Sequence, residues 1–158
     1  MAKPFIKPVI SPEEAAALVK PGASLMVGGF NYGGAPYTLI DALCAAGTRD
    51  INLICVDTSW YNDKEPEPVG VARLVVNGQL GSLVASHIGL NMRTQELYTK
   101  GELMVELIPM GTFVERIRAG GAGLGGVLTP VGVGTVYEEG RGTIELDGRR
   151  YIVERALT

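Results

Sequence analysis

A glycine-rich segment near the N-terminus has the residue types and spacing to bind a ligand through its backbone. It runs Gly28-Gly29-Phe30-Asn31-Tyr32-Gly33-Gly34-Ala35-Pro36, and glycine lets the main chain come close to a ligand. A predicted strand, Ser24–Val27, precedes it, and a predicted helix follows. The free N–H groups of a helix start suit a nucleotide-bearing cofactor or an oxyanion. The alternative is that the glycines only permit a tight turn, and the residue types alone leave both interpretations open.

A second glycine-rich segment, residues 121–126, formally satisfies the dinucleotide pattern G-x-G-x-x-G. That pattern marks a nicotinamide site only where it follows a strand and opens a helix. Here the helix-like Thr112–Ala119 precedes it, and the apolar, proline-broken segment 127–130 follows. We therefore reject a nicotinamide site. The P-loop pattern G-x-x-x-x-G-K-S/T does not occur, which excludes that phosphate site as well.

Single side chains give little support for catalysis within this chain. His87 is the only histidine, and a structural role is expected for it because no cysteine or aspartate arrangement accompanies it in the sequence. Glu115 and Arg116 lie on a predicted helix, where a solvated face is the default, and Trp60 with Tyr61 is expected only to anchor a loop. We assign no catalytic residue and no metal ligand to this chain.

The elements that position the first glycine segment alternate between helix and strand patterns. Ser11-Pro12-Glu13-Glu14 has the sequence of a capping box and predicts a helix that carries Leu18 and Val19 and ends at Pro21-Gly22. A second helix is predicted from Pro36 to Gly47. Three apolar runs predict strands buried on both faces. They are Ile51–Val56, Leu83–Ala85 and Met104–Ile108.

This alternation predicts an α/β fold with a mainly parallel, helix-covered sheet. The polar segment 57–68 predicts an exposed loop. Near the C-terminus, Thr143–Leu146 and Tyr151–Val153 flank Asp147-Gly148, which supplies the positive φ angles of a tight turn. The sequence therefore also predicts a C-terminal β-hairpin.

The composition argues against several classes of protein, namely nucleic-acid-binding, membrane and disulfide-rich proteins. The 158 residues, 46% of them hydrophobic, suffice for one domain. The net charge of −3, without a basic stripe, argues against a nucleic-acid partner. No apolar stretch reaches about 18 residues and no signal-peptide pattern opens the chain, so we expect a soluble protein without membrane contact. Cys44 and Cys55 form no CxxC pair, which favours the reducing cytoplasm over a disulfide framework.

The first glycine segment resembles the first signature of the family I coenzyme A (CoA) transferases. After Gly22 come two free positions, three aliphatic residues and Gly28-Gly29-Phe30, with a later glycine and proline at fixed spacing. The usual opening Asp or Asn is replaced by Pro21, outside the loop. Further segments extend the resemblance over nearly the whole chain. They are residues 85–89, 108–112, 120–126, 129–135 and 154–157.

The resemblance is to the alpha subunits of acetate, butyrate and acetoacetate CoA transferases. It implies that residues 1–158 form a single alpha-type domain lacking the family's C-terminal segment, because such subunits continue past residues 154–157. It implies acyl-CoA and short-chain carboxylic acids as substrates, and no permanently bound cofactor. The implied CoA-binding residues are Gly28, Gly29, Phe30, Asn31, Tyr32, Gly33 and Gly34.

The resemblance also implies a partner. The family's nucleophile is a glutamate in a Glu-Asn-Gly setting on the beta subunit, and no Glu-Asn-Gly occurs in this sequence. A beta-type subunit is therefore expected to supply the catalytic glutamate for a ping-pong reaction through a glutamyl-CoA. The alternative is a non-catalytic ligand-sensing or assembly module on a related α/β fold. We favour the transferase, because a sensor has no need for both glycine-rich segments.

Overall fold

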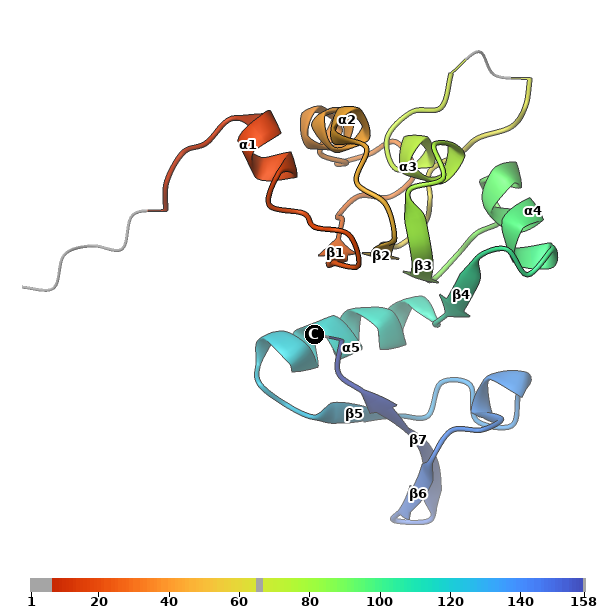
Figure 1. The fold of residues 1–158 in the computed structure, drawn as a ribbon. Helices are drawn as coiled ribbons and strands as arrows, with labels where there is room; N and C mark the ends of the chain where they lie inside the picture. The colour runs from red at the N-terminus through yellow and green to blue at the C-terminus, as the bar shows by residue number, and fades with distance from the viewer. Residues whose placement is uncertain (1–6, 65–66, 158) are drawn as a thin grey trace, which may run out of the picture. The chain divides into compact units, whose positions relative to one another are not determined.

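The structure, a computed structural model, describes residues 7–64 and 67–157. The chain folds into two compact units, Met1–Glu106 and Leu107–Thr158, each with its own set of residue contacts (Figure 1). None of the helices in the described ranges is long and apolar enough to cross a membrane. The expected α/β fold with a mainly parallel sheet and a C-terminal hairpin is confirmed.

The first unit is built on strands that pair in chain order. The four strands β1 (Ser24–Met26), β2 (Ile51–Ile54), β3 (Leu80–Ala85) and β4 (Met104–Leu107) form a sheet in the order β1-β2-β3-β4. The pairs β1–β2 and β2–β3 are parallel. Parallel neighbours need crossover segments, and right-handed crossovers in chain order place the connecting helices on one face.

The crossovers between the parallel pairs are the helices α2 (Tyr37–Ala46) and α3 (Ala72–Val76), and helix α4 (Met92–Thr99) connects β3 to β4. Figure 1 shows α1, α2 and α3 in a row on one side of β1, β2 and β3. The core lies between these helices and the sheet. Its most deeply buried hydrophobic side chains are at most 1% exposed and come from both layers: Ile51, Leu53, Leu74, Leu83 and Ala85.

The first helix confirms the predicted start and contradicts the predicted end. In α1 (Pro12–Ala16) the Ser11 side chain accepts from the Glu14 N–H at 3.1 Å, and the Glu14 carboxylate accepts from the Ser11 N–H at 2.8 Å. The prediction that Leu18 and Val19 belong to this helix is wrong. Their N–H groups bond three residues back, to Ala15 and Ala16, so the chain tightens and leaves the helix.

Strand β4 departs from the prediction of burial on both faces. Met104 is 76% exposed and Leu107 is 38% exposed. β4 lies at the edge of the sheet, so its side chains have a neighbouring strand on one side only.

The second unit pairs a helix with a small antiparallel sheet. Helix α5 (Met110–Gly121) packs against β5 (Gly126–Thr129) and β7 (Arg149–Arg155), and the strand order is β5-β7-β6 with β6 at Thr143–Leu146. The predicted hairpin turn is confirmed, since Asp147 and Gly148 have φ of 50° and 72°.

The proline-broken segment 127–130 proved to be mostly strand. Its proline follows β5 instead of interrupting it. A Cβ at Gly126 would overlap the Glu154 carbonyl oxygen, so glycine is needed for β5 to reach β7. The helix α5 precedes the second glycine segment and a strand follows it, which is the reverse of the order that a dinucleotide site requires.

The prediction of a solvated face is wrong for Arg116 and correct for Glu115. Arg116 is 7% exposed, donates from Nε to the Arg155 carbonyl at 2.7 Å and lies 3.4 Å from the Glu154 carboxylate. Glu154 is also buried, and it accepts from the Tyr137 hydroxyl at 2.7 Å and lies 3.3 Å from Arg141. This buried charge cluster holds α5 to β7.

Candidate functional site

The first glycine segment lies at the carboxyl edge of the parallel sheet. It follows β1, and the neighbouring strand β2 runs in the same direction and leads into residues 55–61. Beyond β1, the Val27 N–H still donates to the Ile54 carbonyl at 3.0 Å. Segments that follow adjacent parallel strands meet at one edge, which is where open α/β sheets bind ligands. We call residues 28–36 the glycine loop.

The glycine loop closes on itself through its own backbone. Phe30 and Gly33 exchange two backbone hydrogen bonds, at 2.9 and 2.8 Å, and so form a tight turn with Asn31 and Tyr32 at its tip. Asn31 has a φ of 52°, which is uncommon for a residue other than glycine. Contacts from outside the loop must hold this conformation.

Two adjacent glycines have different reasons to be glycine. Gly29 has a φ of 124°, and a Cβ there would lie 3.1 Å from the Ala35 nitrogen and 3.2 Å from the Gly33 oxygen. The loop cannot close with a side chain at this position. At Gly28 the φ is not positive, and a Cβ would meet no atom within 4 Å. The space beside Gly28 is therefore open to a ligand.

A second segment, residues 57–61, forms hydrogen bonds with the tip of the glycine loop, and we call this segment the strap. The Asp57 carboxylate accepts from the Asn31 N–H at 2.9 Å, and the Ser59 hydroxyl donates to the Asn31 carbonyl at 3.0 Å. The Asn31 side-chain oxygen accepts from the Trp60 N–H at 2.8 Å. Every polar group of the Asn31 backbone, and its side-chain oxygen, thus bonds to the strap.

The strap corrects the prediction that residues 57–68 form an exposed loop. Asp57, Thr58 and Ser59 are at most 4% exposed, whereas Asp63 and Lys64 are exposed as predicted. The first half is buried because its polar groups bond to segments distant in the sequence. A carboxylate directly after a buried strand, such as Asp57 after Ile51–Val56, was the sequence signal that could have identified it.

The seven predicted ligand-binding residues all lie on the glycine loop, but they divide into three groups. Asn31 is half-buried and bonded to the strap. Phe30 and Tyr32 are 62% and 42% exposed, and the Tyr32 hydroxyl donates to the Trp60 carbonyl at 3.1 Å. The remaining residues, Gly28, Gly29, Gly33 and Gly34, form the backbone around the tip.

Four backbone donors of this loop point to a possible use. Within residues 7–64 and 67–157, the N–H groups of Gly28, Gly29, Gly34 and Ala35 have no hydrogen-bond partner. Backbone N–H groups at a strand-to-helix connection bind phosphate and carboxylate oxygens. The loop can thus bind an anionic group, with the aromatic side chains of Phe30 and Tyr32 beside it.

Cys55 lies beside the glycine loop, and His87 follows the neighbouring strand β3. Burial, followed by the nearby Asp57 carboxylate, raises the pKa of the Cys55 thiol far above its usual range, so it stays protonated. His87 is exposed beyond the end of β3, beside Gly89. In the part of the chain that the structure describes, no three His, Cys, Asp or Glu side chains gather as metal ligands.

The chain is similar to known proteins in sequence. A family model described as Coenzyme A transferase matches residues 9–158. The acetate CoA-transferase subunit alpha of Escherichia coli is 46% identical over 145 residues, which are 92% of this chain and 63% of that protein. The acetoacetyl-CoA:acetate/butyrate CoA transferase alpha subunit of Clostridium acetobutylicum is 42% identical over 150 residues, 95% of this chain and 66% of that protein. The chain spans about two thirds of the length of these relatives.

Solved structures share the fold. An acyl-CoA transferase from Escherichia coli, in a thioester complex with CoA, matches with a TM-score of 0.78 at 23% identity, over 95% of this chain and 32% of that one. The decarboxylase AibA/AibB matches with a TM-score of 0.73 at 30% identity, over 94% of this chain and 58% of that one.

Proposed function

The chain belongs to the coenzyme A transferase family, and from that premise we propose that it is part of an alpha-type subunit that moves CoA between short-chain acyl-CoA and carboxylic acids. The proposed acids are acetate, butyrate or acetoacetate, since relatives are named for them. The observation that carries the proposal is the glycine loop, which combines open space at Gly28 with four backbone N–H donors that have no partner among the described residues.

The proposed reaction divides between two chains. A glutamate of a beta-type partner attacks the acyl-CoA thioester, forming an acyl-glutamyl anhydride and releasing the CoA thiolate. The thiolate then attacks the glutamyl carbonyl and frees the first acid, which leaves a glutamyl-CoA. The second acid reverses these steps and departs as its CoA thioester. CoA is a substrate throughout, and no permanently bound cofactor takes part.

This chain would contribute binding and charge stabilisation. Each attack on a carbonyl creates an oxyanion, and losing one preorganised N–H donor to such an oxyanion costs about 3 kcal/mol. Binding energy from the part of CoA remote from the thioester also helps to orient the reacting carbonyl. The N–H groups of Gly28, Gly29, Gly34 and Ala35 are the donors available on the described part of the glycine loop. We place the reaction in the cytoplasm, where acyl-CoA is available.

The test of the CoA site uses Gly28, because the fold itself does not require glycine there. In a complex of this chain with a beta-type subunit, Gly28→Ala should raise the Kd for CoA by at least about tenfold and leave the Tm unchanged, since only the ligand meets the new methyl group. The control is Gly142→Ala, where φ is also not positive and the nearest contact is the Val153 Cβ at 3.9 Å. Unchanged CoA affinity in Gly28→Ala would contradict the proposed site.

A decarboxylase subunit on the same fold is the second candidate function. The likeness to AibA/AibB, at 30% identity, is the observation that favours it. Carbon dioxide release separates the two candidates, because transfer of CoA between two acids releases none. We expect CoA transfer without carbon dioxide release.

A further inference from the structure

We propose that the strap fixes the conformation of the glycine loop, with Asp57 and Asn91 as its positioning residues. The inference rests on the proposed function for the identity of the ligand, CoA. It adds a statement about which buried groups outside the loop set the affinity for that ligand. Asp57 lines the same small hollow as Gly28 and accepts from the Asn31 N–H, whereas Asn91 acts from further away, through its bond to the Thr58 carbonyl.

The first step is that the loop tip needs outside support. Asn31 has a φ of 52°, and a non-glycine residue in this region is held there by its surroundings. Within the loop, Phe30 and Gly33 exchange two backbone hydrogen bonds, which do not involve Asn31 itself. A two-residue turn of this kind is marginally stable by itself. The strap adds hydrogen bonds to the Asn31 N–H, carbonyl and side chain.

The second step concerns the Asp57 carboxylate, which is 4% exposed. A buried carboxylate needs ion-pair or hydrogen-bond partners. Among the described residues Asp57 has no ion-pair partner, and its oxygens accept from the Asn31 N–H at 2.9 Å and from the Ser59 N–H at 2.7 Å. Charge-assisted bonds of this type are stronger than neutral ones. The carboxylate therefore ties the loop tip to the strap.

The third step is that helix α4 holds the other end of the strap. The Asn91 side chain donates to the Thr58 carbonyl at 2.9 Å and accepts from the Thr94 N–H at 3.0 Å, so it caps α4 and binds the strap at once. The hydroxyls of Thr58 and Thr94 share a hydrogen bond at 2.8 Å. All three side chains are at most 1% exposed. The strap is thus fixed to the start of α4.

An isolated backbone bridge between Tyr61 and Asn91 reinforces this end. The Tyr61 N–H donates to the Leu90 carbonyl at 3.0 Å, and the Met92 N–H donates to the Tyr61 carbonyl at 2.9 Å. Support therefore runs from α4 through the strap to Asn31, and from Asn31 to the backbone donors of the glycine loop.

The test is Asp57→Asn, which keeps the size of the side chain and replaces one acceptor oxygen with an N–H₂ donor. It is made in the complex of this chain with a beta-type subunit. We expect amide hydrogen exchange at Asn31 to accelerate at least about tenfold and the Kd for CoA to rise at least about tenfold, while kcat changes less than the KM for acyl-CoA. Asn91→Ala should act in the same direction. Should Asp57→Asn fail to assemble, Ser59→Ala removes a single bond to Asn31.

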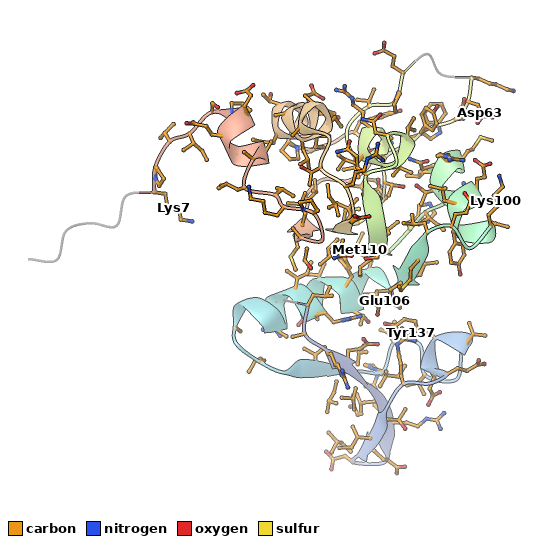
Figure 2. All side chains as sticks on the ribbon, viewed as in Figure 1. Lys7, Asp63, Lys100, Glu106, Met110 and Tyr137 are labelled. Carbon is orange, nitrogen blue, oxygen red and sulfur yellow. The ribbon has the colours of Figure 1, made fainter. Side chains whose placement is uncertain are left out.

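Two controls separate positioning from general destabilisation. Asp63→Asn makes the same substitution on the exposed part of the same loop (Figure 2) and should change nothing. Gln79→Met removes a side chain that is 2% exposed and donates to the Leu43 and Thr48 carbonyls at 3.1 and 2.9 Å. Gln79 lies at the start of β3, the opposite end of a parallel sheet, so its loss should lower the Tm without affecting CoA binding.

Each outcome decides one of the two proposals. Unchanged exchange at Asn31 in Asp57→Asn would overturn the positioning role, and so would faster exchange with unaltered CoA affinity. Equal losses of CoA affinity in Asp57→Asn and Gln79→Met would reduce Asp57 to a stability residue and overturn it too. If the unsubstituted complex bound no CoA, the proposed function would fail, while the exchange rates would still decide whether the strap holds the loop.

Discussion

At the scale of single residues, the neighbouring glycines Gly28 and Gly29 are subject to different structural constraints. Gly29 is fixed by the geometry of the loop, because a Cβ there would crowd the backbone of Ala35 and Gly33. Gly28 has no such constraint, so its reason for being glycine lies outside the described fold. The sequence shows glycine at both positions. Only the φ angles and the surrounding atoms distinguish a glycine that the loop requires from one that it does not.

This difference changes what a substitution at Gly29 measures. Gly29→Val should lower kcat/KM by at least about 100-fold, which is about 2.7 kcal/mol. The positive φ and the contacts at 3.1 to 3.2 Å predict that the loop itself deforms, so faster amide exchange at Gly33 should accompany the loss. Normal exchange at Gly33 together with normal turnover would show that the loop tolerates a side chain there.

Tyr137 lies on the short 3-10 helix η1 (Val136–Glu138) (Figure 2), and its titration with pH tests its hydrogen bond to Glu154. Burial, followed by the hydrogen bond to Glu154, raises the pKa of Tyr137 to about 12. Because the folded chain holds this proton more tightly than the unfolded chain, the stabilisation is complete below about pH 10, the ordinary pKa of tyrosine. It is lost as the pH rises toward 12.

The measurement is the phenolate absorbance of the folded chain against pH. The difference between the unsubstituted chain and Tyr137→Phe should titrate near 12. A difference that titrates near the ordinary value of about 10 would mean that the hydroxyl is not bonded to Glu154.

At the scale of elements, local patterns predicted the fold and distant partners limited the prediction. The capping box at Ser11 and the Asp147-Gly148 turn depend on adjacent residues, so the sequence contains all that determines them. The burial of Asp57 depends on Asn31, and that of Arg116 depends on Glu154. Those partners come together only after the strands have paired, so neither periodicity nor local composition could identify them.

Helix α5 carries one buried and one exposed arginine, and substituting each in turn tests how much the buried charge cluster stabilises the fold. Arg116→Met should lower the free energy of unfolding by about 3 kcal/mol, because it leaves the buried Glu154 carboxylate without one of its partners. Arg118→Met removes an exposed arginine from the same helix, paired at 2.6 Å with Glu115, and should leave the free energy of unfolding nearly unchanged because solvent screens the pair. Chemical denaturation of the two variants gives the comparison. Equal costs would contradict a structural role for the Arg116–Glu154 pair.

At the scale of the whole molecule, the proposed enzyme divides the CoA-binding loop and the nucleophile between two chains. The described cysteine next to the loop, Cys55, is buried and protonated, and the sequence has no Glu-Asn-Gly. Relatives named as alpha subunits support a two-chain enzyme, as proposed above.

Complex formation itself should appear as co-elution of this chain with a beta-type subunit in size-exclusion chromatography, and separate elution of the two chains would contradict it.

The most direct test of the central claim is transfer of CoA from acetyl-CoA to butyrate, followed as butyryl-CoA by mass spectrometry. The chain alone, the beta-type subunit alone and the complex are compared under the same conditions. We predict steady formation of butyryl-CoA by the complex and none by either chain alone, because we propose that the binding loop and the catalytic carboxylate belong to different chains. Turnover by this chain alone, or no turnover by a complex that has assembled, would contradict the account.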